Sequence, residues 1–323
     1  MTQFQADDDQ LLSSDGGQEF VISGMALWEW WQWARQTAIA HHIPPQEADW
    51  LLQAFTHLDR LELRLGSFQH REHLLLKVPP HRLQELWEQR TQQRVPVQYL
   101  VGKTTWRDFS LQVSPAVLIP RPETELLIDF AVELTNQRSD EPEREGLPTP
   151  GHWADLGTGS GAIALGLAQA FPQARIHAVD VSAAALAIAQ TNAAAHQFSD
   201  RIHFYQGHWL EPLHPLRGQL HGIIANPPYI PSSQVLTLQP EVTQHEPHLA
   251  LDGGVDGLDC IRHLVAAAPA YLQPGGIWMI EMMAGQAVTV AQLLNQNGHY
   301  DNIQIRADLA GIERFAIARR ISG

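Results

Sequence analysis

The amino-acid sequence predicts an α/β protein in which a small helical bundle precedes a parallel sheet with an antiparallel edge. From residue 152 onward, short apolar strands alternate with helical segments, a pattern typical of a parallel sheet covered by helices. Residues 26–94 instead carry a helical pattern alone. The length of 323 residues agrees with two domains of ordinary size.

Residues 1–22 are predicted to be a disordered acidic tail, because they are polar and contain few large apolar side chains. This start is the reverse of a signal peptide, which is basic and then apolar. No run of about 18 apolar residues occurs in the sequence, so we expect no membrane span.

Residues 23–95 are predicted to form a domain of four short helices. The first helix ends at Pro44–Pro45, and Pro45 and Pro80 suit the first turns of later helices. Large aromatic side chains in such a small bundle are expected in its core. The expected core tryptophans are Trp28, Trp31, Trp50 and Trp87.

Residues 96–120 alternate around Gly102–Lys103 and predict a β-hairpin linker. Residues 121–323 would form the second domain, with a helix opening at Pro122. Within this domain, residues 137–151 are charged and rich in proline and glycine, so we expect a surface linker there.

Seven apolar segments in the second domain predict its sheet. The expected strands are 152–156, 175–180, 201–206, 220–226, 275–282, 302–308 and 314–320. The expected helices begin near Gly161 and cover 183–196, 257–271 and 285–298. The last two strands would form the antiparallel edge pair.

A glycine-rich turn links the first strand to its helix. Gly157, Gly159 and Gly161 would let the backbone approach a ligand closely beside the helix N-terminus. Asp180 ends the second strand, where a carboxylate can bind both hydroxyls of a ribose. With Ala162 the turn also satisfies the dinucleotide-binding pattern, so a nicotinamide-dependent dehydrogenase is an alternative.

The segment DLGTGSG, which begins at Asp155, resembles the first motif of Rossmann-like S-adenosylmethionine methyltransferases. The resemblance implies the seven-stranded fold of class I methyltransferases. It also implies that Asp180 holds the ribose and that the turn packs against the methionine part of S-adenosyl-L-methionine, with S-adenosyl-L-homocysteine as product. The implied cofactor-binding residues of this segment are Asp155, Gly157, Thr158, Gly159, Ser160 and Gly161.

The sequence Asn-Pro-Pro-Tyr at residues 226–229 follows the fourth strand, at the edge of the sheet where open α/β folds bind ligands. The Asn226 side-chain oxygen and the Pro227 carbonyl are two acceptors, and Pro227 and Pro228 fix the backbone between them. Tyr229 offers a flat face to a planar group. This set suits an amide or aromatic amine whose lone pair must be aimed at a methyl donor. Because the sulfonium is already activated, we expect no general base.

Five segments together resemble the protein-(glutamine-N5) methyltransferases that modify peptide chain release factors, the HemK/PrmC family. They are VLIPRPETE, DLGTGSGAIAL, NPPYI, EPHLALDGGVDGLDCIRHL and DLAGIERF, and the resemblance covers residues 25–320. It implies methyl transfer to the glutamine of a Gly-Gly-Gln motif, with the release factor docked on the helical domain. It also implies that Trp209 packs beside the adenine, that Asn226 contacts the cofactor and that residues 226–229 hold the glutamine.

Other residues in these segments receive no separate role or depart from the family pattern. Arg121 and Glu123 lie in a segment that covers the active site in the family. His208 stands where an acidic or polar residue is common, and Met283 stands where glycine is usual. We expect activity despite these departures, because neither residue belongs to the Asn-Pro-Pro-Tyr motif.

Related substrates and a non-enzymatic role remain alternatives. Related enzymes methylate a glutamine of a ribosomal protein, and others methylate adenine N6 in nucleic acids. A net charge of −14 and only two lysines argue against direct binding of nucleic acid. A catalytically silent adaptor that grips release factors is a third hypothesis.

The histidines, the single cysteine and the Gly-Gly-Gln string near the N-terminus predict no further functional site. The 17 histidines show no metal-ligand pattern such as HExxH, so we expect no metal. Cys260, the single cysteine, has the surroundings of a core residue and agrees with a reducing cytoplasm. Gly16–Gln18 mimics the expected substrate, but short strings of this kind are common in polar tails. We expect a cytoplasmic monomer.

Overall fold

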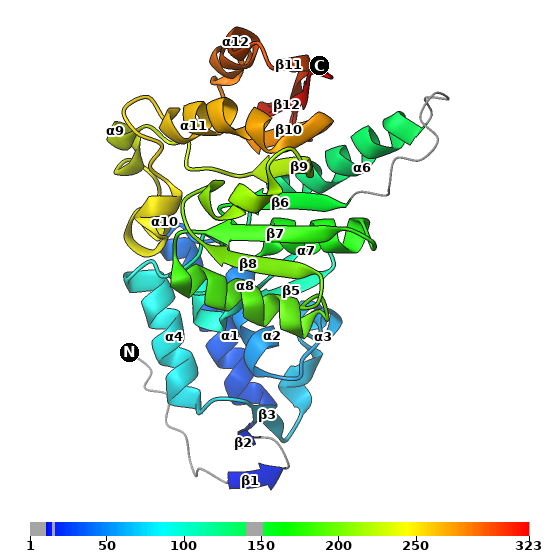
Figure 1. The fold of residues 1–323 in the computed structure, drawn as a ribbon. Coiled ribbons are helices and arrows are strands. Elements are labelled where there is room, and N and C mark those ends of the chain that lie inside the picture. The colour runs from blue at the N-terminus through cyan, green and yellow to red at the C-terminus, as the bar shows by residue number, and fades with distance from the viewer. Residues whose placement is uncertain (1–10, 15–16, 140–150, 323) are drawn as a thin grey trace. The chain divides into compact units, whose positions relative to one another are not determined.

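The computed structural model describes residues 11–14, 17–139 and 151–322. Its contacts divide the chain into two compact units, Met1–Gly102 and Lys103–Gly323 (Figure 1). Most of the predicted surface linker at 137–151 lies outside the described residues. None of the helices within those ranges combines the length and the apolar composition needed to cross a bilayer.

The first unit contains the four predicted helices together with a small sheet. Its helices are α1 (Gly24–Ala40), α2 (Gln46–Phe55), α3 (Arg60–Leu65), α4 (Pro80–Gln92) and α5 (Val97–Val101), with the 3₁₀ helix η1 (Ser67–His70). Its strands are β1 (Leu11–Ser14), β2 (Gly17–Ile22) and β3 (Leu74–Leu76), which are antiparallel in that order.

The prediction of a disordered tail through residue 22 is wrong for residues 11–14 and 17–22. Residues 11–14 form β1, which pairs with β2, and residues 17–22 form β2, which also pairs with β3 from Phe20 to Ile22. The Ile22 side chain is buried in the core of this unit. A distant strand therefore supplies the hydrogen-bond partners that the local composition did not reveal. The tail residues 1–10 and 15–16 lie outside the described residues.

The tryptophans that are buried in the core of the first unit differ in part from those predicted. Trp31 and Trp87 are buried as expected, but Trp50 is 48% exposed. Helix α2 instead buries smaller side chains on its inner face, at Ala48, Leu51 and Leu52. Trp30, which the prediction omitted, is buried and packs its ring edge against Trp87.

The predicted hairpin is present, but its turn lies elsewhere. Strands β4 (Lys103–Trp106) and β5 (Phe109–Gln112) pair around the turn at Arg107–Asp108, not around Gly102–Lys103. Residues 97–101 form helix α5 between Pro96 and Gly102, whose φ is +76°. A proline before the first turn and a left-handed glycine after the last one are helix-boundary signals that outweighed the alternating pattern.

The second unit contains the predicted seven-stranded sheet. Its strands are β6 (His152–Leu156), β7 (Arg175–Asp180), β8 (Ile202–Gln206), β9 (Leu220–Ala225), β10 (Leu272–Glu281), β11 (Tyr300–Ala307) and β12 (Glu313–Arg320). The order is β11-β12-β10-β9-β6-β7-β8. Neighbours from β10 to β8 are parallel, and β12 is antiparallel to both β10 and β11. The predicted fold class is confirmed.

Helices cover both faces of this sheet (Figure 1). One buried cluster joins the sheet to α6 (Leu126–Ser139), α7 (Ala162–Ala170) and α8 (Ala183–Ala195). A second joins the other face to α11 (Asp259–Ala267) and α12 (Ala287–Asn297). Short helices complete the unit: α9 (Ser232–Val235), α10 (Pro240–His245), η2 (Pro122–Glu125), η3 (Glu211–Leu216), η4 (His248–Ala250) and η5 (Ala268–Ala270).

The topology places a ligand site between β6 and β9. From β6 the chain continues to β7, toward one edge of the sheet, whereas from β9 it continues to β10, toward the opposite edge. Loops that diverge in this way leave a crevice at the carboxyl ends of the two strands. The glycine turn follows β6 and the Asn-Pro-Pro-Tyr segment follows β9, so both predicted motifs reach this crevice.

Candidate active site

The turn after β6 has a left-handed backbone at all three predicted glycines. The φ angles of Gly157, Gly159 and Gly161 are +74°, +54° and +84°. The turn is tied to the next strand, because the amides of Gly157 and Thr158 both donate to the Val179 carbonyl, at 2.8 and 3.0 Å. Left-handed φ angles at alternate positions are accessible to glycine at little cost.

Asp180 holds the middle of this turn. Its Oδ2 accepts from the Gly159 amide at 2.9 Å, and its Oδ1 accepts from the Ser182 amide at 2.9 Å. A carboxylate oxygen has more than one acceptor site, so both oxygens can still accept from a ligand. Asp180 thus orders the turn and presents negative charge at the end of β7.

Asp155 lies beneath the turn and is fully buried. Its Oδ2 accepts from the Thr158 hydroxyl at 2.6 Å and from the Ala164 amide at 3.0 Å. Its Oδ1 has no hydrogen-bond partner among the described residues. Burial raises the pKa of this carboxyl to about 7, against the hydrogen bonds from Thr158 and Ala164. Asp155 therefore supports the turn from below and has unused acceptor capacity.

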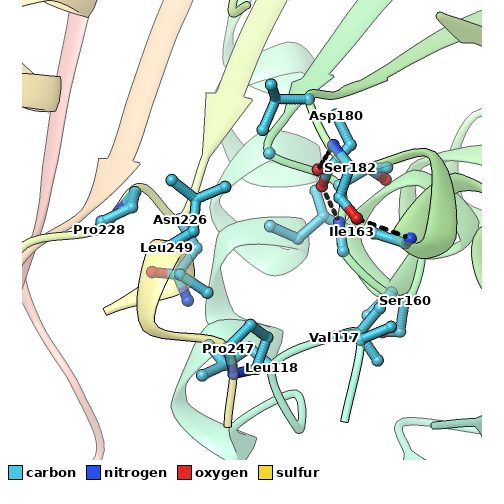
Figure 2. A pocket seen from close by; sticks show the side chains of 18 of the residues that line it. Val117, Leu118, Ser160, Ile163, Asp180, Ser182, Asn226, Pro228, Pro247 and Leu249 are labelled. Carbon is cyan, nitrogen blue, oxygen red and sulfur yellow. Dashed lines mark hydrogen bonds between the residues drawn. The ribbon is translucent and has the colours of Figure 1, made fainter. Parts of the chain in front are cut away.

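A cavity of about 250 Å³ opens between the two motifs. In Figure 2, Asp180 and Ser182 lie across the cavity from Asn226 and Pro228. The predicted site residues that line it are Gly157, Thr158, Gly159, Ser160, Asp180, Trp209, Asn226 and Pro228. Asp155, Gly161, Pro227 and Tyr229 belong to the same segments but are not among the lining residues.

Trp209 forms one wall of the cavity from the loop after β8. Its ring is half-buried and lies 3.5 Å from the position that a Cβ on Gly157 would take. The neighbouring His208, a departure from the family pattern, also lines the cavity, with its ring edge toward Trp209 at 5.7 Å between centroids. The position of His208 therefore bears directly on any ligand beside Trp209.

Asn226 is oriented by a threonine that the sequence interpretation did not single out. Its Nδ2 donates to the Thr124 hydroxyl oxygen at 3.3 Å. Its Oδ1 makes no hydrogen bond to a described residue, and the same holds for the Pro227 carbonyl. Because Asn226 lines the cavity, its oxygen is available to accept from a ligand there.

Glu281, at the end of β10, was also missed. It is buried and accepts from the Thr124 hydroxyl at 2.6 Å and from the Tyr229 hydroxyl at 3.1 Å. Burial, together with Glu281, raises the pKa of Tyr229 well above its ordinary value, so Tyr229 stays protonated. An acidic residue at the carboxyl end of the strand beside β9 was the available signal for Glu281.

Two further segments cover the cavity. Leu118 and Pro120 of the first segment and Pro247 and Leu249 of the second line it; Leu118, Pro247 and Leu249 are labelled in Figure 2. An ion pair links the two segments, because the Arg121 guanidinium donates to the buried Glu246 carboxylate at 2.6 Å. Arg121 thus has a visible partner, whereas Glu123 is not among the residues that line the cavity.

The loop at residues 252–257 contains three glycines and two aspartates, and it fixes the backbone of residues 228–231. The Ile230 amide donates to the Leu251 carbonyl at 3.0 Å, and the Gly253 amide donates to the Ile230 carbonyl at 2.9 Å. Gln286 donates to the Tyr229 carbonyl at 2.9 Å and accepts from the Met283 amide at 2.9 Å. Met283 therefore fits this network despite its departure from glycine.

The described residues contain no group of three or more His, Cys, Asp or Glu side chains placed to hold a metal ion. Cys260 lines the cavity and is partly buried, which agrees with the predicted core or near-core position. Burial raises the pKa of its thiol, so it has little thiolate character.

Comparisons with known proteins agree with this architecture. A family model described as "PrmC N-terminal domain" matches residues 29–102, and one described as "Methyltransferase small domain" matches residues 142–255. The catalytic domain of hMettl16, solved with a MAT2A 3′UTR hairpin, has a TM-score of 0.52 at 13% identity, over 75% of this chain and 81% of that one. This likeness concerns the fold alone.

Two curated relatives cover almost the whole chain. The release factor glutamine methyltransferase of Synechocystis sp. is 53% identical over 93% of this chain and 98% of its own length. That of Thermosynechococcus vestitus is 48% identical over 92% of this chain and 99% of its own length. Identity at this level over nearly full length, with the glycine turn and the Asn-Pro-Pro-Tyr segment on one cavity, identifies the chain as an enzyme that belongs to the release factor glutamine methyltransferase family.

Proposed function

We propose that this protein transfers a methyl group from S-adenosyl-L-methionine to the side-chain amide nitrogen of the glutamine in the Gly-Gly-Gln motif of peptide chain release factors. The proposal rests mainly on the hydrogen bonding of the Asn226 side-chain amide. Its Nδ2 is engaged by Thr124, which leaves its Oδ1 as an acceptor on a cavity whose facing side is the glycine turn. The names of the curated relatives support the choice of substrate.

The residues around the glycine turn fit S-adenosylmethionine. A Cβ at Gly159 would meet no atom within 4 Å, so the absent side chain leaves room on the cavity wall. Asp180 can accept from the ribose hydroxyls, and Trp209 offers a flat face to the adenine. Asp155 is not among the lining residues, so its part in cofactor binding would be to support the turn through Thr158 and Ala164. When bound, the cofactor supplies an activated methyl group on sulfonium.

The Asn-Pro-Pro-Tyr segment would prepare the substrate amide. An amide nitrogen is a poor nucleophile because its lone pair is delocalised into the carbonyl. The Asn226 Oδ1 and the Pro227 carbonyl would accept its two N–H groups, and Tyr229 would pack against its plane. Holding both hydrogens favours a pyramidal nitrogen whose lone pair points across the cavity, an orientation effect worth several kcal/mol. The proton lost after transfer passes to water.

The helical unit would dock the release factor, as the family resemblance implies. A cytoplasmic monomer would suffice, because every residue that lines the cavity belongs to the second unit of one chain. No feature of the cavity favours adenine over a protein amide. Adenine and a ribosomal-protein glutamine are therefore treated as alternative acceptors in the test.

The test is transfer of labelled methyl from S-adenosylmethionine to a purified release factor. The parallel substrates are the same factor with its motif glutamine replaced by alanine, a ribosomal-protein mixture and a DNA duplex. We expect label on the wild-type factor alone. Asn226→Ala should lower kcat by about 10²–10³-fold, as for the loss of one orienting group at a reacting centre. Its Kd for S-adenosylmethionine should stay within about threefold, since the glycine turn is untouched.

The matched control is Asn295→Ala. Asn295 is exposed on α12, and its Nδ2 bonds only within that helix. It should keep wild-type kcat. Label on DNA would move the acceptor to adenine, and full activity of Asn226→Ala would overturn the assignment of that residue.

A further inference from the structure

Four side chains at one wall of the cavity and behind it are joined by continuous hydrogen bonds. The Asn226 amide donates to Thr124, the Thr124 hydroxyl donates to Glu281, and the Tyr229 hydroxyl donates to the other oxygen of Glu281. These residues come from three separate segments: η2, the Asn-Pro-Pro-Tyr segment after β9, and the end of β10. The chain therefore exists only in the folded second unit.

The direction of these hydrogen bonds follows from the number of hydrogens available. An ionised carboxylate can only accept. The single hydroxyl hydrogen of Thr124 is therefore directed to Glu281, at 2.6 Å. Thr124 can then only accept from Asn226, so it must face the NH₂ group of that amide and not its oxygen. The Asn226 oxygen consequently stays on the side available to the cavity.

Glu281 is held where its charge cannot be screened by water. Glu281 is 2% exposed, and its carboxylate accepts hydrogen bonds from Tyr229 and Thr124. Arg314 on β12 is the cation that favours its ionised form, while Glu123 on η2 opposes it. Arg314 is itself bound by Asp308 at 2.7 Å, so its charge is shared. Arg121 and Arg314 act on Tyr229, whose pKa they lower against the larger effect of burial.

We propose that Glu281 is a positioning residue for the methyl transfer: through Thr124 it sets the Asn226 amide so that an acceptor, and not a donor, faces the substrate. The site then selects a group that carries N–H. The inference rests on the proposed function, because it concerns the same amide. It adds Thr124, which lines the cavity beside Asn226, and Glu281, which is not among the lining residues and acts through Thr124.

The hydrogen bonds from Glu281 through Thr124 to Asn226, which we call the relay, would make kcat depend on pH. Side-chain packing alone would not have this effect. When Glu281 is protonated, it can donate to Thr124, and Thr124 can then donate to the Asn226 oxygen. That reversal requires the Asn226 amide to make a half-turn about its Cβ–Cγ bond, which takes the acceptor oxygen away from the cavity and places the NH₂ group there. Burial raises the pKa of Glu281 above its ordinary value, with Glu123 acting in the same direction. Hence kcat should fall as pH falls through the pKa of Glu281 and should be full above it.

The primary variant is Glu281→Gln, which keeps the shape but can donate its NH₂ to Thr124. We expect kcat to fall about 10–100-fold at pH 8, with the KM for the release factor and the Kd for S-adenosylmethionine within about threefold of wild type. The acid limb of the kcat profile should also disappear, because Gln does not titrate. Glu313→Gln is the matched control, since Glu313 is exposed on β12 in the same unit, and it should keep both kcat and the acid limb.

A second pair of variants tests the relay through Thr124. Thr124→Ser keeps the hydroxyl and should retain kcat within about threefold. Thr124→Val keeps the shape but breaks the relay, so it should lower kcat at least tenfold, and adding Glu281→Gln to it should cost little more. This pair decides the question if Glu281→Gln does not fold.

Distinct results separate this inference from the function itself. If the wild-type enzyme does not label the release factor, the proposed function fails. If it does, and Thr124→Val or Glu281→Gln keeps wild-type kcat and the acid limb, the relay alone is overturned. Equal losses in Thr124→Ser and Thr124→Val would also overturn it, because packing would then explain both.

Discussion

The three glycines of the turn after β6 are required for different physical reasons. A Cβ at Gly161 would lie 3.2 Å from the Ala189 Cβ, so this glycine permits α7 and α8 to pack closely. A Cβ at Gly157 would lie in ordinary contact with the Trp209 ring. A Cβ at Gly159 would meet nothing within 4 Å and would extend into the open cavity. All three glycines have a left-handed φ, but only at Gly159 is the space beside the backbone explained by a ligand.

Gly159→Ala should weaken S-adenosylmethionine binding about tenfold, or about 1.4 kcal/mol, because the methyl group takes up space that the cofactor needs. Its free energy of unfolding should fall by about 1 kcal/mol, since a left-handed φ is costly for alanine. Isothermal titration and urea unfolding measure the two effects.

Gly311→Ala is the matched control for this prediction. Gly311 also has a left-handed φ, of +80°, and a Cβ there would also meet nothing within 4 Å. It lies in the turn between β11 and β12, away from the cavity-lining residues. We expect a similar loss of stability with unchanged cofactor affinity. Equal affinity in Gly159→Ala would show that this glycine serves the turn and not the ligand.

At the scale of secondary-structure elements, three adjacent strands carry a line of histidines. His152 on β6 and His177 on β7 are 2.9 Å apart between Nδ1 and Nε2, and the His177 ring stacks on His203 of β8. His177 also contacts the Tyr205 hydroxyl at 3.1 Å. Burial lowers the pKa of His177 to about 4, and the neighbouring His152, His203 and Arg175 add to the effect.

This line should make the second unit sensitive to acid. His177 is neutral in the folded state down to about pH 4, but in the unfolded chain it binds a proton near pH 6.5. The contribution of neutral His177 to the free energy of unfolding is therefore complete above pH 6.5. It is lost as the pH falls from 6.5 toward 4. We expect His177→Gln to reduce the loss of unfolding free energy between pH 7.5 and pH 5 by about 1–2 kcal/mol.

Urea unfolding at the two pH values measures this difference. His299→Gln provides the control, because His299 is exposed on the loop before β11 and should leave the pH dependence of wild type. The same slope in His177→Gln and wild type would assign the acid sensitivity to other groups.

At the scale of the whole molecule, the chain has separate hydrophobic cores. The core of the first unit contains Trp30, Trp31 and Trp87, whereas the two clusters that flank the seven-stranded sheet contain residues of the second unit only. The cavity is lined by residues from 116 to 260, all in the second unit. Under the proposed function, cofactor binding and release factor docking would belong to different parts of the chain.

Trp87→Ala should separate these two functions. Removing a fully buried tryptophan costs about 3–5 kcal/mol in the first unit. We expect methylation of the release factor to fall at least tenfold while the Kd for S-adenosylmethionine stays within about threefold. Trp50→Ala is the control, because Trp50 is 48% exposed in the same unit and its loss should cost less than about 1 kcal/mol. Loss of cofactor binding in Trp87→Ala would contradict the division.

Some features of the site were predictable because neighbours along the chain determine them. The glycine turn and Asp180 are separated by one strand–helix–strand unit, and Asn226 to Tyr229 form a single segment. Thr124, Glu246 and Glu281 were not predictable in the same way. Their partners are Asn226, Arg121 and Tyr229, which lie between 52 and 125 residues away along the chain. No local pattern records such a pairing.

The sequence by itself determined the class of fold, the order of strands and helices after residue 152, and the two motifs that meet at the end of the sheet. These properties depend on apolar periodicity and on backbone restrictions at glycine and proline, which act over a few residues. Only the tertiary structure decided that residues 17–22 form a strand, that Trp50 faces outward, and that Glu281 and Thr124 stand behind Asn226. Each of these depends on a partner distant in the chain, and hydrogen bonds and burial are satisfied only when the folded backbone brings that partner within contact.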